Sequence, residues 1–248
     1  MTDFLEELEK LAEQLKKGPT KEQQTDSQVL LKLARKDLKS SQLNYEGQIY
    51  NNAAYNLQQA VEKAAKSYFT LIGVLDAKTI RGTGHDSPKL FLRMLEQPWA
   101  KQFAGLCGAS FPSINLMADT SEAQKVVDKG KGEMARMPSE HILTVLSFPP
   151  KLEKALEPIF ETLNRDFITA YLRLYILACV TFPHEEFSRY GDKEVKPSEY
   201  TSDLGIVKAM PEVWTELETT IDAIQHLIES SGQRADNAID TNQNEVSN

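Results

Sequence analysis

The chain has 248 residues, of which 41% are hydrophobic, so it is long enough to bury a core in one large domain or two small ones. Its formal net charge of −8 argues against a protein covered in basic surface for wrapping nucleic acid or coating anionic membranes. Cys107 and Cys179 lie far apart without a CxxC partner, which suits a reducing compartment. No apolar run approaches the ~18 residues that a membrane span requires, so a soluble, cytoplasmic protein is expected.

The N-terminal segment, residues 1–18, is predicted to form an amphipathic helical arm. Its apolar residues recur at helical spacing from Phe4 to Leu15 and stop at Gly18, which is followed by a proline that cannot continue a helix. The polar segment 20–28 is interpreted as a linker to a second helix. The apolar face predicted for this helix consists of Leu30, Leu33, Ala34 and Leu38.

A third helix is predicted over Tyr50 to Gly73, where small apolar residues recur by threes and fours. They are Ala53, Ala54, Ala60, Ala64 and Ala65. Small side chains let another helix approach closely along one face, and the glycine is a natural helix terminator. The alanine spacing is compatible with a core or with a binding site, and packing is the favoured interpretation.

The rest of the chain also shows helical periodicity and no alternating strand pattern. We expect an amphipathic run from Leu90 to Leu95, a helical insertion at about 97–149, and a helix of about thirty residues that ends before Pro183. A last helix is predicted from near Pro211 to Gly232, and residues 232–248 are predicted to be disordered. The expected fold is all-α: an up-and-down helical bundle over 28–231 with this insertion, the N-terminal arm and a disordered tail.

Two segments of the sequence resemble the HEPN superfamily, the helical domains of prokaryotic defence and toxin modules. The first is "LARKDLKSSQLNYEGQIYNNAAYNLQQAVEKAAKSYFTLIG" followed by "GHD", and the second is "TFPHEEFSRYGD" before a closing helix, where Gly191 replaces the proline of the family pattern. Together they cover about half of the chain. The resemblance implies a HEPN-like bundle that often dimerises, acts in stress or phage defence, and works beside a nucleotidyltransferase partner.

A local excess of positive charge supports a contact with RNA or a nucleotide. Residues 28–93 contain ten Lys and Arg against five Asp and Glu, a net charge of +5 in an otherwise acidic chain. The predicted phosphate-binding residues are Lys63, Lys66, Arg81, His85 and Lys89. The turn after Pro183 supplies a second cluster, for which a structural, dimer-cleft or ligand-binding role stays open. It contains His184, Arg189 and Tyr190.

Whether the chain is an enzyme stays open in the sequence. Catalytic HEPN proteins are metal-independent ribonucleases that carry an arginine, four to six residues, then a histidine near the start of the last helix. Arg136 and His141 match this spacing, but the pair lies in the insertion. If it is catalytic, the histidine takes the proton of a ribose 2′-hydroxyl and the arginine stabilises the phosphorane.

A third alternative is a non-catalytic interaction module that recruits a protein through the N-terminal arm and the helix of Trp214. No signature of a metal site, a nucleotide-binding loop or another cofactor site is found, so no cofactor or metal is expected.

Overall fold

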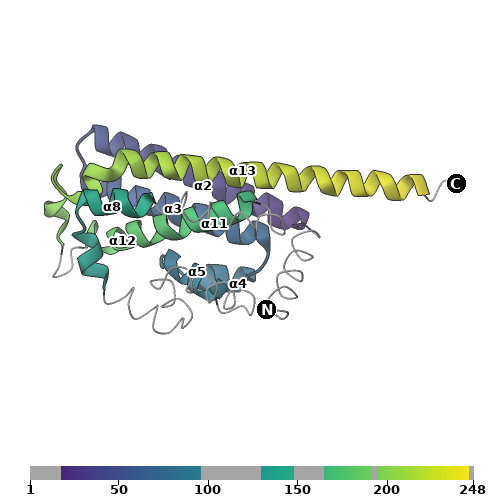
Figure 1. Cartoon of the computed structure of the whole chain (residues 1–248), viewed down its shortest axis with the longest axis horizontal. Helices are drawn as coiled ribbons and strands as arrows, with labels where there is room; N and C mark the ends of the chain where they lie inside the picture. Colours follow the sequence, from purple (N-terminus) through teal and green to yellow (C-terminus); the bar gives the residue numbers. More distant parts are fainter. Residues whose placement is uncertain (1–17, 96–129, 148–164, 191–194, 246–248) are drawn as a thin grey trace.

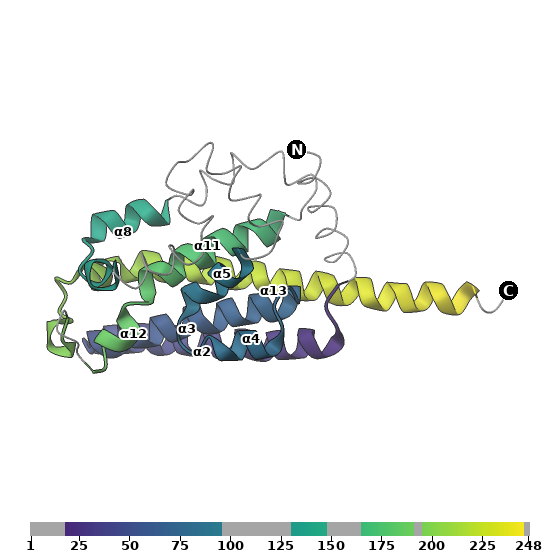
Figure 2. The same cartoon turned by 90° about the horizontal axis from the view of Figure 1, so that it is seen from below.

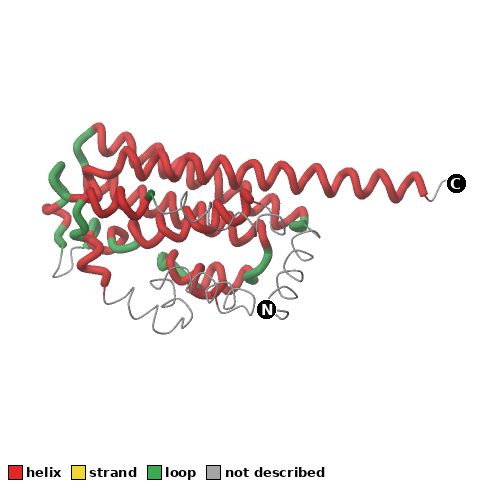
Figure 3. The backbone as a smooth tube through the Cα atoms, viewed as in Figure 1, coloured by secondary structure: helices red, strands yellow, loops and turns green. Residues whose placement is uncertain are grey.

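The computed structural model describes residues 18–95, 130–147, 165–190 and 195–245. Within these ranges the chain is all-α: Figure 3 shows helices joined by short loops, with no strand in the described part. The long helices are α2 (Lys21–Glu46), α3 (Tyr50–Ile72), α11 (Arg165–Thr181) and α13 (Gly205–Glu245). They run side by side along the long axis of the molecule (Figure 1), as predicted for an up-and-down bundle.

The shorter helices lie around this bundle. They are α4 (Ala77–Gly82), α5 (Ser87–Leu95), α8 (Ser139–Leu146), α12 (His184–Phe187) and the 3-10 turn η2 (Pro197–Glu199). Residues 130–135 are also helical, and both they and α8 lie in the segment predicted as a helical insertion. The N-terminal arm, most of the insertion and the first part of the predicted long helix fall outside the described residues.

The small-residue stripe of α3 is buried in the centre of the bundle. Ala53, Ala60 and Ala64 have no exposed surface, so α2 approaches α3 closely, as the alanine spacing predicts. Reciprocal hydrogen bonds fix this contact, because each of the hydroxyls of Ser27 and Ser67 donates to the backbone carbonyl of the other residue, at 3.0 and 2.8 Å.

Two helix starts differ from the prediction. The helix α2 begins at Lys21, inside the predicted linker, because Thr20 and Gln23 form a reciprocal capping box. The side chain of Thr20 accepts from the backbone of Gln23, and the side chain of Gln23 accepts from the backbone of Thr20. The helix α13 begins at Gly205, ahead of Pro211, which therefore lies inside the helix and removes one backbone donor from it.

The predicted end of the last helix at Gly232 is wrong. The helix α13 continues through this glycine to Glu245, past the other described helices (Figure 2). A glycine inside a helix costs only about 1 kcal/mol relative to alanine, so it does not end a helix by itself.

Candidate functional site

The predicted cations of α3 are held by carboxylates. Lys66 Nζ lies 2.7 Å from the Glu62 carboxylate and donates to the backbone carbonyl of Gly84 at 2.8 Å. Lys63 forms an ion pair with Asp37 of α2. Because both positive charges are compensated inside the bundle, neither residue offers a free cation to a phosphate.

Glu62 also holds the loop between α4 and α5 on α3. Its buried carboxylate lies 3.0 Å from His85 Nδ1, and Gln58 donates to the backbone carbonyl of His85 at 3.2 Å. The His85 side chain is still 57% exposed, so its ring remains open to solvent. The predicted loop residue is therefore fixed in place by a buried acid, an arrangement that can orient an imidazole for hydrogen bonding or proton transfer.

A cleft of about 400 Å³ lies between α4 and α5. Eight residues line it: Val74, Leu75, Asp76, Thr79, Gly82, Thr83, Lys89 and Arg93. Lys89 and Arg93 are one helical turn apart on α5, so their side chains share one face. These two cations give the cleft a positively charged side that can bind a phosphate.

The opposite wall of this cleft carries an acid. Asp76 caps α4: its carboxylate accepts from the backbone amide of Thr79 at 2.8 Å and from the Thr79 hydroxyl at 2.8 Å. These hydrogen bonds, the backbone one first, lower the pKa of Asp76. The carboxylate therefore remains ionised in the neutral range and is directed toward the start of α4. Arg81 is exposed and donates from Nε to the carbonyl of Ala77 at 3.1 Å; it does not line the cleft.

The turn after Pro183 separates into a buried and an exposed part. His184 is buried, its Nδ1 lies 2.8 Å from the Tyr200 hydroxyl, and its Nε2 has no hydrogen-bond partner among the described residues. Burial lowers the pKa of His184 to about 3, so the ring is neutral at physiological pH. This histidine packs inside the protein and is not accessible to a large ligand.

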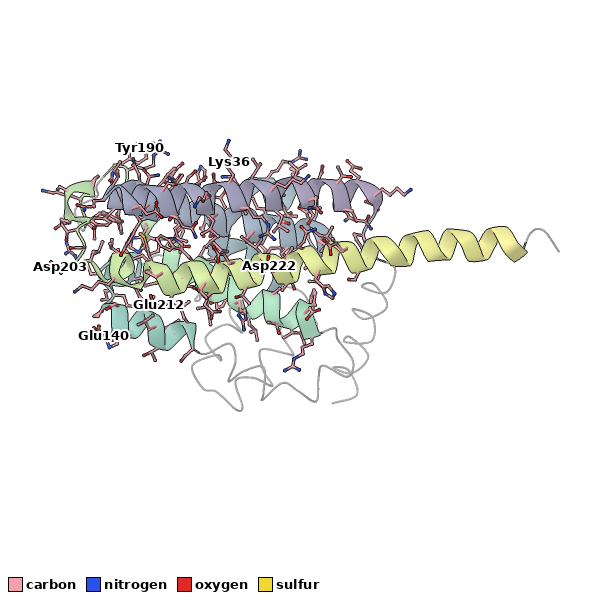
Figure 4. The ribbon with its side chains drawn as sticks, turned by 90° about the horizontal axis from the view of Figure 1, so that it is seen from above. Lys36, Glu140, Tyr190, Asp203, Glu212 and Asp222 are labelled. Atoms are coloured by element: carbon pink, nitrogen blue, oxygen red, sulfur yellow. The ribbon has the colours of Figure 1, made fainter. Side chains whose placement is uncertain are left out.

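Arg189 and Tyr190 lie on the exposed part of the same turn. The Arg189 guanidinium carbon lies 4.8 Å from the ring centroid of Tyr55 on α3 and 4.9 Å from that of Tyr190. Figure 4 shows Tyr190 projecting from the molecule on the same side as Lys36 of α2. The sequence predicted both turn residues as ligand-binding, and the structure adds Tyr55 as the partner of Arg189.

Arg136 and His141 flank the turn that enters α8, and both are exposed. Arg136 lies 3.6 Å from the carboxylate of Glu199. In space the turn packs against the first residue of α13: a Cβ added at Gly205 would lie 2.0 Å from the carbonyl oxygen of Met137. The pair belongs to the insertion in sequence, but its turn adjoins the start of the last helix.

The structure brings two of the predicted clusters to one side of α3. Tyr55 contacts Arg189, and Glu62 contacts His85 seven residues further along the same helix. At 1.5 Å per residue the two contact points are about 10 Å apart along α3. Figures 1 and 2 agree in placing α12 and α4 on this side. The Arg136–His141 turn lies on other elements, α8 and α13.

Two contributors to these clusters escaped the sequence prediction. Arg93 could have been found, because it is four residues after Lys89 on a predicted helix. Tyr55 could not, because its partner Arg189 is 134 residues away in the chain.

Among the described residues no group of three or more His, Cys, Asp or Glu side chains is arranged to hold a metal ion. None of the helices in the described ranges combines the length and the apolar character needed to cross a bilayer.

Comparison with known proteins identifies a family. No curated protein and no solved structure matched the chain. The HEPN domain family matched residues 27–82, a segment that contains most of α2 together with α3 and α4. This family indicates a function that involves RNA or nucleotides in general terms. This match over part of the chain supports its membership of the HEPN superfamily.

Proposed function

We propose that this HEPN-like module binds RNA or a nucleotide by its phosphates, in the cleft between α4 and α5. The observation that carries the proposal is the pair of cations on α5, Lys89 and Arg93, in the lining of this cleft. A volume of about 400 Å³ is within the usual range for small-ligand sites. In its cellular role the module would act in the cytoplasm, in stress or phage defence, as a homodimer and beside a nucleotidyltransferase.

The distribution of charge supports the cleft over the α3 face as the phosphate site. Lys63 and Lys66 are paired with carboxylates, so a phosphate would have to break existing ion pairs to reach them. Lys89 lines an open cleft, so a phosphate could reach it without breaking an ion pair of this kind. Arg81 and His85 lie on the α4–α5 segment outside this lining, where they can contact a strand that extends from the cleft.

Binding to short single-stranded RNA and to nucleotides at low salt tests the proposal. Lys89→Ala should weaken the binding of RNA, and the slope of log K against log salt should fall by roughly 0.7, the value for one phosphate contact on a single strand. The matched control is Lys78→Ala, which removes the same charge from an exposed position of α4 outside the cleft. Equal losses in both variants, or no binding by the wild type, would refute a site in this cleft.

A second candidate function is a metal-independent ribonuclease that uses Arg136 and His141. The observation in its favour is the close approach of their turn to Gly205 at the start of α13. In this reaction the imidazole takes the 2′-hydroxyl proton, the 2′-oxygen attacks the phosphorus, and the guanidinium stabilises the phosphorane. The bond between phosphorus and the 5′-oxygen then breaks, and the 5′-oxygen takes a proton from the imidazolium or from water. Arg136 would have to exchange its contact with Glu199 for the phosphate.

Cleavage of single-stranded RNA in the presence of a chelator tests the ribonuclease. We expect His141→Ala to lose any cleavage, because general acid–base groups contribute about 10²–10⁴-fold to a rate. His226→Ala is the matched control, since this histidine is exposed on α13 and contacts Asp166. Retention of cleavage by His141→Ala would exclude this mechanism.

A further inference from the structure

The turn after α12 holds an arginine between two tyrosine rings on the surface. Arg189 contacts the ring of Tyr55 at 4.8 Å and that of Tyr190 at 4.9 Å, and its Nη1 donates to the Tyr55 hydroxyl at 3.3 Å. Tyr190 is 70% exposed, the highest value among the large hydrophobic side chains described. A stacked guanidinium thus supports an aromatic ring that keeps most of its surface in solvent.

This turn is held rigidly by its neighbours. Phe187 and Ser188 are buried, and the amides of Arg189 and Tyr190 both donate to the carbonyl of Glu186, at 3.2 and 2.9 Å. Asn51 of α3 donates to the carbonyl of Ser188 at 3.4 Å. The backbone is therefore fixed without help from the exposed ring, so the stability of the turn does not explain why a tyrosine is presented there.

The charge of Arg189 is also uncompensated among the described residues. Other cations of the bundle face acids: Arg35 pairs with Asp222 and Arg173 pairs with Glu216. No carboxylate of the described residues pairs with Arg189; tyrosines flank it instead. An exposed aromatic ring beside a free positive charge is the combination that binds the bases and backbone of single-stranded nucleic acid.

We propose that Tyr190, supported by Arg189 and Tyr55, is a stacking site for a nucleobase of single-stranded RNA. The inference rests on the proposed function, because the phosphates of the same strand would occupy the α4–α5 cleft. The two places are compatible with one short strand, since Tyr55 and Glu62 share a face of α3 and are about 10 Å apart along it. His85, on the loop that joins α4 to α5, contacts Glu62.

The Tyr190 site is expected to bind an unpaired base of single-stranded RNA in preference to a free nucleotide or a duplex. The residues that line the cleft lie within 74–93 and include none from α12 or the turn after it, so a free nucleotide can bind in the cleft without contacting Tyr190. In a duplex both faces of every internal base are already stacked, so an exposed ring has no face to contact. Stacking on an aromatic ring tolerates any base, so a dependence on the presence of bases is expected and a strong sequence preference is not.

The test compares two fluorescently labelled strands by anisotropy: a short single-stranded RNA, and the same backbone with abasic ribose at every position. Tyr190→Ala should weaken the binding of the normal strand about fivefold or more and should leave the abasic strand unchanged. Tyr190→Phe keeps the ring and should bind like the wild type. Leu43→Ala is the control for loss of an exposed apolar side chain, and circular dichroism checks that each variant folds.

The outcomes separate this inference from the proposed function. Lys89→Ala should weaken both strands alike, because it removes a phosphate contact. If Lys89→Ala weakens both strands while Tyr190→Ala binds the normal strand like the wild type, the stacking site is refuted and the phosphate cleft is supported. A Tyr190 ring that contacts a protein partner instead of a base would give this result. Equal binding of the normal and abasic strands by the wild type also refutes stacking. No binding of either strand by the wild type refutes both proposals.

Discussion

Replacing Gly205 by alanine should loosen the contact between the Arg136–His141 turn and the last helix. A Cβ at this position would lie 2.0 Å from the carbonyl oxygen of Met137 and 2.9 Å from the amide nitrogen of Ser139. A carbon atom needs at least 3.0 Å from such neighbours, so the backbone of the turn must move by about 1 Å. Backbone cannot rotate away as a flexible side chain does, so α8 must shift with it.

The magnitude follows from two opposing effects. Overpacking a well-packed contact costs typically 1–3 kcal/mol, and a clash with backbone belongs at the upper end of this range. Alanine offsets up to about 1 kcal/mol of this cost through its higher helix propensity. We therefore expect a net loss of about 2 kcal/mol in the free energy of unfolding, which lowers the Tm of a chain of this size by roughly 4–8 °C.

Thermal and urea unfolding followed by circular dichroism measure this loss. Gly82→Ala is the matched control, because the alanine Cβ at the end of α4 would meet no atom within 4 Å. This variant should be as stable as the wild type or slightly more stable. If Gly205→Ala unfolds at the same temperature as Gly82→Ala, the turn does not pack on α13 as described, and the observation that favours the ribonuclease alternative is lost.

Two further predictions concern the start of α2 and the buried histidine. Thr20→Ala should lower the free energy of unfolding by about 1 kcal/mol, because it removes the capping box with Gln23. Thr25→Ala is the control at an exposed interior position of α2 and should change the stability little. Equal urea midpoints for the two variants would contradict a stabilising cap. Because burial lowers the pKa of His184, this histidine is protonated in the unfolded chain at a higher pH than in the folded protein. Its contribution to the stability of the folded protein is therefore complete above about pH 6.5 and is lost as the pH falls toward about 3. Lowering the pH from 6.5 to 5 should reduce the free energy of unfolding of the wild type by about 2 kcal/mol through this histidine. A His184→Gln variant should lack this part of the pH dependence, and the same slope of stability against pH in both proteins would refute the prediction.

Local patterns predicted the helices well where packing determines the pattern. The stripe of α3 could be identified from Ala53, Ala60 and Ala64, because a helix that lies close to a neighbour needs small residues at that spacing. The start of α2 was missed although the Thr20–Gln23 spacing of a capping box was present in the sequence. At the other end of the fold, Gly232 predicted a helix end where there is none: α13 continues through it to Glu245. A glycine is a typical helix terminator, but the residues around it are compatible with a helix.

The sequence identified the cationic residues of the candidate site, but it did not show which of them are paired with carboxylates. The pairing of Lys66 with Glu62 could be inferred from their spacing of four residues. The pairing of Lys63 with Asp37 depends on the register between α2 and α3, which composition does not determine. The stack of Arg189 on Tyr55 depends on where a distant turn meets α3, so only coordinates could reveal it.

The contacts between α2 and α13 have a consequence for folding. Arg35 meets Asp222, Gln42 donates to Glu218 at 3.0 Å, and Trp214 donates to Ser41 at 3.0 Å. The partners are separated by more than 170 residues, whereas α2 and α3 are joined by a turn of three residues. During synthesis the α2–α3 hairpin can therefore form early, but one of its sides stays uncovered until α13 has left the ribosome. Closure of the bundle must therefore be a late step, and the apolar side of the hairpin that faces α13 stays exposed to solvent until then.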